Sequence, residues 1–256
     1  MKNLRYLAAA LFLVAAMLPG ATVASAANPY TCTGGVIPPG TYSSLTIAGD
    51  CSIPGGTVVV LGDLVVQPGA GLNAAIPPGG TVTVYGGAVV GKDAIFVLGC
   101  APSICPTKVT NDRIFGSLRA DRPLAVILHG NIIGGHVSIQ GGGGGASCAP
   151  NAHLGSVIGF PGIPAYTTFE GNTITGGLSV SGMQSCWLGL IRNDIRGAVK
   201  LQNNTMADPD AMEIVTNKIR GSLSCYGNSP KPQVGDSAGT ANQVTGALRG
   251  QCAMIH

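Results

Sequence analysis

Three carboxylates lie close together in the segment ADPDAMEIV, at Asp208, Asp210 and Glu213. Carboxylate oxygens are the ligands that Ca²⁺ prefers, and paired carboxyl groups can serve as acid and base in glycoside cleavage. The segment lacks the alternating acidic positions and the glycine of a dedicated Ca²⁺ loop, so the alternative is a solvated loop in which an aspartate caps a turn. Ca²⁺ is the one metal or cofactor that these residues suggest, and no catalytic residue is predicted.

A second group of residues is basic and recurs at alternate positions of similar short segments. The full set is Arg113, Arg119, His136, Arg196, Lys200, Lys218, Arg220 and Arg249. Its C-terminal members, Arg196, Lys200, Lys218, Arg220 and Arg249, are the predicted polyanion-binding residues, and we expect them to share one outward sheet. Clustered cations attract an extended anionic polymer. The alternative is that charges on exposed strands prevent the sheets of different molecules from associating.

The remaining residue types that could take part in chemistry give weaker indications of a functional site. His129 and His153 fall in the inward phase of their segments, which favours hydrogen-bonded core residues over metal ligands. Trp187 follows a cysteine, which indicates packing against a disulfide, although an exposed Trp could also stack on a sugar ring. The glycine run at 141–145 lacks the Lys and Ser or Thr of a phosphate loop, and the chain contains no G-x-S-x-G motif.

All eight cysteines lie beyond residue 26. An even number in an exported chain favours disulfides, and no second Cys or His pair is spaced to complete a zinc site with the C-x₄-C segment CAPSIC. Although the sequence alone permits other connectivities, pairing neighbours along the chain predicts the bonds Cys32–Cys51, Cys100–Cys105, Cys148–Cys186 and Cys225–Cys252.

The first 26 residues have the features of a secretory signal peptide. Lys2 and Arg5 precede an apolar run at 7–18, and the segment ends in Ala-Ser-Ala at 24–26. The predicted organisation is therefore a signal peptide at 1–26 and one domain at 27–256. Because the apolar run is too short to cross a membrane, we expect a secreted, extracellular or cell-surface protein with no membrane span after cleavage.

The mature chain is close to neutral. Removing Lys2 and Arg5 lowers the formal net charge from +3 to +1, so no global charge favours nucleic acid as a partner. Charged residues make up 10% of the chain and glycine contributes 40 residues. Both values indicate many turns and little exposed helix.

A repeated segment of the form N-x-I-x-G-x-[LV]-x-[VL] positions these candidate residues. Copies begin at Asn131, Asn172, Asn193, Asn217 and Asn242, and Asp112 replaces the Asn in DRIFGSLRA. Alternate residues of a strand face one side, so the Asn, Ile, Gly, Leu and Val of the motif share an apolar face. The intervening residues face water.

Aligning the segments on the motif glycine extends the series along the chain. The predicted glycines are Gly49, Gly62, Gly86, Gly116, Gly135, Gly155, Gly176, Gly197, Gly221 and Gly246. An internal period in the twenties is typical of a solenoid, and returns rich in Gly and Pro exclude the helical return of a leucine-rich repeat. We therefore predict an all-β fold: a disulfide-stapled, single-stranded, right-handed parallel β-helix of about nine or ten coils. The asparagines would form a ladder, and the glycine would permit the bend between sheets.

Several blocks of the sequence resemble a family of exported actinobacterial proteins with parallel β-helix repeats. The blocks are IPPGTYSSLTI, HGNIIGGHVSIQGGGGG, FEGNTITGGLSVSGMQSCWLGLIRN and ADPDAMEIVTNKIRGSLSCYGNSPKPQVGDSAGTANQVTGALRGQC. The resemblance extends over nearly all of the mature chain, and it implies export and a β-helix but no particular activity. The early segment VVVLGDLVVQPGAGL also resembles the polymerising β-helices called bactofilins, through a more general pattern.

Two classes of function remain. The first is a secreted or cell-surface β-helix with a non-catalytic role, either structural or binding an anionic polysaccharide, another cell-envelope polymer or a partner protein. The alternative is a polysaccharide lyase or glycoside hydrolase acting on an acidic polysaccharide. A lyase needs a Ca²⁺-holding carboxylate group beside a basic side chain, whereas here the basic residues lie on the strand face and the acids in a loop. The sequence therefore favours the non-catalytic role.

Overall fold

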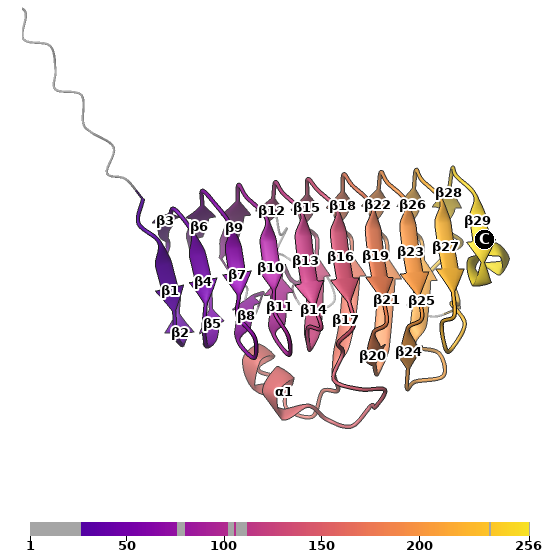
Figure 1. The fold of residues 1–256 in the computed structure, drawn as a ribbon, viewed down its shortest axis with the longest axis horizontal. Coiled ribbons are helices and arrows are strands. Elements are labelled where there is room, and N and C mark those ends of the chain that lie inside the picture. The colour runs from indigo at the N-terminus through magenta and orange to yellow at the C-terminus, as the bar shows by residue number, and fades with distance from the viewer. Residues whose placement is uncertain (1–26, 76–79, 102–104, 106–111, 236, 256) are drawn as a thin grey trace, which may run out of the picture.

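The computed structural model describes residues 27–75, 80–101, 105, 112–235 and 237–255 of the 256-residue chain, so the expected signal peptide lies outside the described residues. The chain forms a rod of stacked coils whose strands gather into three sheets of ten, eight and nine strands (Figure 1). Neighbouring strands in these sheets pair in parallel, as a β-helix requires. Sheet A descends on the near side in Figure 1 and the other two sheets return behind it, so the winding is right-handed. The predicted fold is confirmed.

Most coils contribute one strand to each sheet. Sheet A consists of β1 (Tyr30–Cys32), β4 (Leu45–Ile47), β7 (Leu64–Val66), β10 (Ala88–Val90), β13 (Leu118–Asp121), β16 (Val137–Gln140), β19 (Leu178–Ser181), β23 (Val199–Gln202), β27 (Leu223–Tyr226) and β29 (Leu248–Gly250). Sheet B consists of β2 (Gly35–Val36), β5 (Asp50–Ser52), β8 (Gly71–Ala74), β11 (Ile95–Leu98), β14 (Ala125–His129), β17 (Tyr166–Glu170), β21 (Trp187–Ile191) and β25 (Met212–Val215).

Sheet C closes each coil and leads back to sheet A. It consists of β3 (Gly40–Tyr42), β6 (Thr57–Val60), β9 (Thr81–Val84), β12 (Arg113–Ile114), β15 (Ile132–Ile133), β18 (Thr173–Ile174), β22 (Asp194–Ile195), β26 (Lys218–Ile219) and β28 (Gln243–Val244). The other elements are the strand pair β20 (Gln184–Ser185) and β24 (Thr205–Met206), the helix α1 (Ala152–Ile158) and the 3₁₀ helix η1 (Gln251–Met254).

One continuous apolar cluster fills the interior of the rod. In sheet A the inward residues stack in register as the row Leu45, Leu64, Ala88, Leu118, Val137, Leu178, Val199, Leu223 and Leu248. Neighbouring strands of a sheet lie about 4.8 Å apart, so ten strands give a rod of roughly 45 Å. The alternation of apolar residues in the sequence is thus the direct cause of the stacked coils.

The motif asparagines form a buried ladder at the turn from sheet B to sheet C. Asn193 is typical, because its Nδ2 donates to Asn217 Oδ1 at 2.9 Å and its Oδ1 accepts from Asn172 Nδ2 at 3.0 Å. The same Oδ1 also accepts from the backbone N–H of Asn172 at 2.9 Å. Asp112 occupies this row as predicted, and its Oδ1 accepts from the backbone N–H of Val82 at 2.6 Å. Each side chain therefore satisfies buried polar groups of a neighbouring coil.

The motif glycines lie at the corner between sheets C and A. Eight of the predicted glycines form one row: Gly62, Gly86, Gly116, Gly135, Gly176, Gly197, Gly221 and Gly246. A Cβ added at any of them would lie 2.5 to 2.7 Å from a backbone atom of a neighbouring coil. The close stacking of this corner therefore requires glycine.

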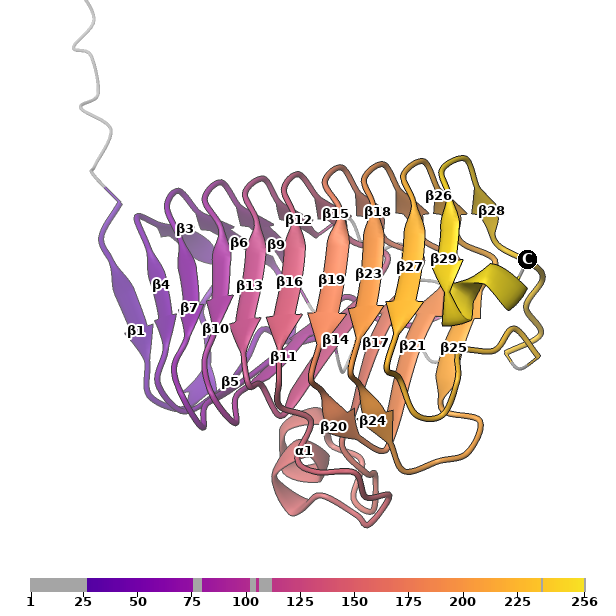
Figure 2. The same ribbon diagram turned by 45° about the vertical axis from the view of Figure 1, so that its right-hand side comes forward.

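Two glycines of the predicted series were wrong. Gly49 lies in the turn between β4 and β5, and Gly155 lies in α1, so NAHLGSVIG is a helix and not a coil. Asn151 caps α1 by accepting from the backbone N–H of Leu154 at 2.9 Å, and Gly159 ends it with a φ of 76°. Residues 141–165 are thus an insertion between β16 and β17, at the base of the rod in Figures 1 and 2.

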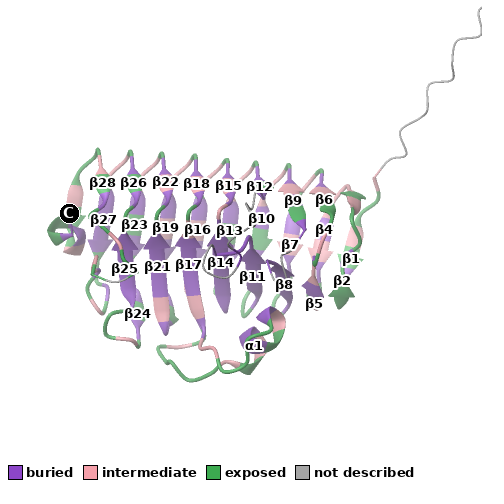
Figure 3. Cartoon of the chain, turned by 180° about the vertical axis from the view of Figure 1, so that it is seen from behind, coloured by how far each residue is buried: buried purple, intermediate pink, exposed green. Residues whose placement is uncertain are grey.

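The insertion folds back on the outer face of sheet B. Leu154 and Ile158 of α1 pack there with Val97 and Ile127. Sheet B is buried on both faces over much of its length, as its purple strands show in Figure 3. His153 was expected to face the interior, but it lies on the exposed side of α1 and its Nε2 forms a hydrogen bond with Asp50 Oδ1 at 2.9 Å.

All four predicted disulfides are confirmed: Cys32–Cys51, Cys100–Cys105, Cys148–Cys186 and Cys225–Cys252. The first joins β1 to β5 at one end of the rod, and the last joins β27 to η1 at the other. The Cys148–Cys186 bond holds the insertion against the coil that follows it. Three of the disulfides therefore fasten the two ends of the solenoid and the insertion at 141–165.

Candidate functional site

One outward residue precedes each corner glycine, and these residues form a line along the rod that we call the corner row. Its members are Leu61, Tyr85, Phe115, Gly134, Thr175, Arg196, Arg220 and Thr245, all exposed. The backbone fixes their register, since the N–H of Arg220 donates to Ile195 O just as the N–H of Arg196 donates to Ile174 O. The turns that carry the row align along the upper edge of the rod in Figure 2.

The expectation that the five predicted polyanion-binding residues share one sheet was wrong. Arg196 and Arg220 belong to the corner row, Lys218 lies on β26 of sheet C, and Lys200 and Arg249 lie on β23 and β29 of sheet A. The physical reason is the corner itself, because the glycine in the middle of each motif divides the segment between two sheets. The five residues nevertheless flank one corner of three consecutive coils.

These three coils are strongly basic at the corner. Segments 193–202, 217–226 and 242–250 contain the five cations and one carboxylate, Asp194. Arg220 pairs with it at 3.4 Å between two partly exposed side chains, and such a pair contributes little to stability. Among the described residues, the other four cations have no carboxylate oxygen within 4.0 Å. Adjacent coils lie about 4.8 Å apart, within the Debye length of about 8 Å, so these charges act together.

The remaining basic candidates lie further toward the N-terminal end of the rod. Arg113 lies on β12 and Arg119 on β13, both exposed. His136 lies at the corner, where its Nε2 forms a hydrogen bond with Ser179 Oγ at 3.1 Å. Burial and the neighbouring Lys200 lower the pKa of His136, which disfavours the charged form of this side chain.

The three carboxylates proposed for Ca²⁺ meet different surroundings. Asp208 Oδ1 accepts from the backbone N–H of Asp210 at 3.0 Å, which is the capped turn that the sequence offered as the alternative. Glu213 is buried in β25, where its Oε2 accepts from Ser237 Oγ at 2.7 Å. All three lie on or beside sheet B, whereas the basic residues flank the corner between sheets C and A.

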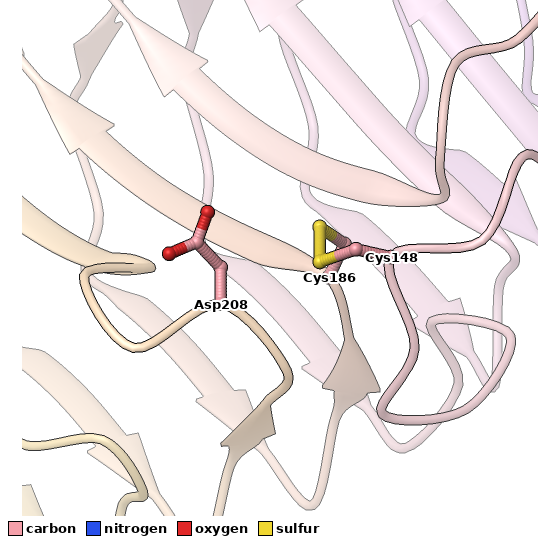
Figure 4. Close-up of side chains that lie close together, drawn as sticks. All are labelled: Cys148, Cys186 and Asp208. Atoms are coloured by element: carbon pink, nitrogen blue, oxygen red, sulfur yellow. A yellow bond between two sulfur atoms is a disulfide. The ribbon is translucent and has the colours of Figure 1, made fainter.

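Asp208 also approaches the Cys148–Cys186 disulfide, with ligand-type atoms of the three residues within 4.8 Å of one another (Figure 4). Within the described ranges this is the group of metal-ligand side chains that the fold brings together. Cysteine binds metal ions as the thiolate, and both sulfur atoms here are bonded to each other. In this disulfide form the group offers one carboxylate.

A cavity of about 160 Å³ lies on the outer face of sheet B. Val97, Ile127, Ile158 and Phe160 line it, with His129 and Tyr166 as the polar side chains. His129 was expected to face the interior of the coil, but it lies in the outer layer that the insertion covers, and it is 7% exposed. Burial lowers the pKa of His129, against the opposing effect of Glu170, and burial raises the pKa of Tyr166 to about 12.

Two features were missed in the sequence although a signal for each was present. A second amide ladder runs from Asn204 through Asn228 to Gln251, with side-chain bonds of 2.9 and 3.0 Å. These residues follow sheet A strands at separations of 24 and 23 residues, which is the period of the coils. The second feature is the apolar part of the corner row. Its signal in the sequence is the large apolar residue that directly precedes the motif glycine in three successive copies, as Leu61, Tyr85 and Phe115.

Comparison with protein-family models, curated proteins and solved structures finds no match. The fold and site define the class: a disulfide-bonded parallel β-helix with one basic corner. The resemblance to exported actinobacterial β-helix proteins stays a prediction. None of the described helices is long and apolar enough to cross a membrane.

Proposed function

We propose that this protein is a non-catalytic extracellular β-helix that binds an extended acidic polysaccharide along its basic corner. The observation that carries the proposal is the charge of segments 193–202, 217–226 and 242–250, in which five cations face a single carboxylate. The coils repeat at about 4.8 Å, so these cations flank one corner over three consecutive coils, which suits an extended polymer with repeated anionic groups.

The location of the acids supports binding rather than cleavage. A glycosidase needs paired carboxylates across a groove, and a lyase needs carboxylates beside a basic side chain. In this chain Asp208, Asp210 and Glu213 lie on the sheet B side of the coil, and the basic corner lies between sheets C and A. The carboxylate at the corner, Asp194, is paired with Arg220.

The four disulfides support an oxidising compartment. Acidic polymers of the cell envelope or of its surroundings are the polyanions that an exported chain meets. We infer that export depends on the leader at 1–26, whose charged start and apolar run are those of a signal peptide.

The test is binding of polygalacturonate, a polymer of uronic acid, to the oxidised chain 27–256 over a range of salt concentrations. We expect affinity to fall as salt rises, because screening weakens exposed charge pairs. The variant Arg196→Gln/Arg220→Gln should bind at least about tenfold more weakly, a loss of about 1.4 kcal/mol, with an unchanged melting temperature. Lys92→Gln/Arg122→Gln is the matched control, since it removes two exposed cations that lie in the turns following sheet A strands.

Three results would refute this function. They are an affinity that does not depend on salt, an equal loss in the control variant, and release of reducing ends or unsaturated sugars from the polymer. Duplex DNA serves as a second polyanion, and binding to it as tight as to polygalacturonate would refute the assignment to a polysaccharide.

A further inference from the structure

The corner row changes its chemistry along the rod. Leu61, Tyr85 and Phe115 occupy three consecutive coils and are 51%, 55% and 50% exposed. The rings of Tyr85 and Phe115 are stacked, with centroids 5.0 Å apart and planes 7° from parallel. We call these three residues the apolar segment of the corner row. A continuous strip of large apolar side chains on a surface is a feature of binding sites more than of ordinary surfaces.

The fold does not require apolar residues at these positions. Gly134 and Thr175 occupy the same row, are also exposed, and are flanked in the same way by a buried residue and a corner glycine. Leu61, Tyr85 and Phe115 therefore do not fill space that the coil leaves open. Half-exposed apolar side chains at these positions gain less burial free energy than the same side chains would gain in the core.

The position after Phe115 in the corner row carries no side chain. Tyr85 stacks on the Phe115 ring, and the next residue of the row after Phe115 is Gly134, which has no side chain. The next side chain in the row is Thr175, two coils beyond Phe115 and therefore about 10 Å away along the rod. A flat ring can occupy this gap and pack against the Phe115 ring.

The apolar segment lies in line with the basic part of the same row. Three coil steps separate Phe115 from Arg196, a distance of about 14 Å, and six separate Leu61 from Arg220, about 29 Å. A polymer that lies lengthwise on the corner row reaches both parts. Its anionic groups meet Arg196 and Arg220, and rings with apolar faces meet Phe115, Tyr85 and Leu61.

We propose that Leu61, Tyr85 and Phe115 are a subsite for the apolar faces of pyranose rings, in one lengthwise site for an acidic polysaccharide that ends at Arg196 and Arg220. This inference rests on the proposed function and adds the orientation of the polymer and the chemistry of both ends. It predicts a ligand that is both anionic and composed of six-membered sugar rings, and longer than the basic part of the row.

The experiment measures binding of galacturonate oligomers of graded length to the chain 27–256 and to Tyr85→Ser/Phe115→Ser. For oligomers that span the whole row, the variant should bind about tenfold more weakly, because two aromatic faces lose their contacts. The dependence of affinity on salt should stay the same, because no charge is removed. For oligomers too short to reach from Arg196 to Phe115, the variant and the unaltered chain should bind equally.

Val89→Ser is the matched control, because Val89 is 45% exposed on β10 of sheet A and lies outside the corner row. Equal binding of long oligomers by the aromatic variant, or an equal loss in Val89→Ser, would overturn the subsite. A dimer of the unaltered chain that Tyr85→Ser/Phe115→Ser converts to a monomer would also overturn it, since the apolar segment would then be an interface between copies. Failure of the polyanion proposal is separate: it appears as unaltered binding and salt dependence in Arg196→Gln/Arg220→Gln.

Discussion

At the scale of single residues, the buried amides hold the coils in register. Each ladder asparagine replaces the hydrogen bonds that the backbone of a turn lacks, so one side chain serves two coils. The ladder Asn172, Asn193, Asn217 and Asn242 is continuous through side-chain and backbone bonds. An amide at this position is therefore a structural requirement, and its repetition in the sequence reflects the stacking of coils and no ligand.

Replacing Asn193 by Ala is expected to destabilise the protein strongly. The change removes the acceptor of the Asn172 N–H and the donors to Phe169 O and Asn217 Oδ1, all of which are buried. Buried polar groups without partners cost about 1 to 3 kcal/mol each, and three groups are affected, so we expect a loss of at least about 3 kcal/mol in the free energy of unfolding. Thermal and urea unfolding measure it against Gln202→Ala, an exposed change in the same coil. A loss within about 0.5 kcal/mol of the control, the range of ordinary surface changes, would contradict the structural role of the ladder.

His129 is expected to make stability depend on pH. Burial lowers its pKa in the folded chain below the usual value near 6.5, so the unfolded chain takes up the proton first as pH falls. Stability is then greatest above about pH 6.5 and decreases below it. The charged groups around it are Glu170, at 3.7 Å, and Arg192, which pairs with Glu170.

The measurement is the melting temperature between about pH 7.5 and 5.5, in the range where histidine titrates. His129→Gln should reduce the slope of melting temperature against pH, even if the variant is less stable throughout. His136→Gln, which changes a more exposed histidine, should reduce the slope less. An unchanged slope in His129→Gln would show that this imidazole is not the group responsible.

At the scale of elements, the corner between sheets C and A decides where side chains point. Strand periodicity alone correctly predicted the buried Ile and Leu on either side of the motif glycine. Both side chains face inward whether or not the chain bends at the glycine. It could not predict that Lys218 and Lys200 would lie on different sheets, because the bend depends on the close approach of backbones in neighbouring coils. That contact is between residues far apart in the sequence, such as Gly176 and Gly197.

The insertion illustrates a different limit. The segment NAHLGSVIG carries Gly155 at the interval expected for a coil, and the strand pattern therefore matched it. The local signals of a helix were also present, in the N-cap Asn151 and the terminal Gly159. The segment folds as a helix, as these local signals indicate, because the helix buries Leu154 and Ile158 against sheet B. A strand at this place would not bury them there. The disulfides were predictable because each one joins two cysteines that are neighbours along the chain.

Adding one methyl group at the corner tests this account of the fold. Gly197→Ala would bring a Cβ to 2.5 Å from the backbone nitrogen of Gly177, and the backbone cannot move without shifting the adjacent coil. We expect a loss of roughly 1 to 3 kcal/mol in the free energy of unfolding, as for overpacked sites. Thr175→Ala, at the exposed position before Gly176, is the control and should be near neutral. Equal stability of Gly197→Ala and the control would refute the close stacking of the corner.

At the scale of the whole molecule, the rod has different surfaces on its different sides. Sheet B is covered by α1, the insertion and loops, whereas the corner between sheets C and A is open along the rod and carries both the cations and the exposed aromatic residues. A solenoid offers such a line without any specialised loop, because equivalent residues of successive coils are aligned by the backbone. The alignment of these exposed side chains follows from the fold, and the site that we propose along them depends on their identity in the sequence.

The ends of the rod limit its stability, because each coil is held by its neighbours and the last one has a neighbour on one side only. The Cys225–Cys252 bond holds η1 over the end of sheet A, where Cys252 is fully buried. Closing its loop contributes roughly 3 kcal/mol in the chain-entropy model.

Cys225→Ser/Cys252→Ser should therefore accelerate hydrogen exchange in β27, β29 and η1 first, and progressively less in β23 and β19. Cys100→Ser/Cys105→Ser, which removes a bond that lies away from the ends, is the control and should leave exchange in these strands unchanged. Uniform acceleration along the whole rod in the first variant would mean that the coils unfold as one unit, and that the disulfide does not act as a fastening of the end.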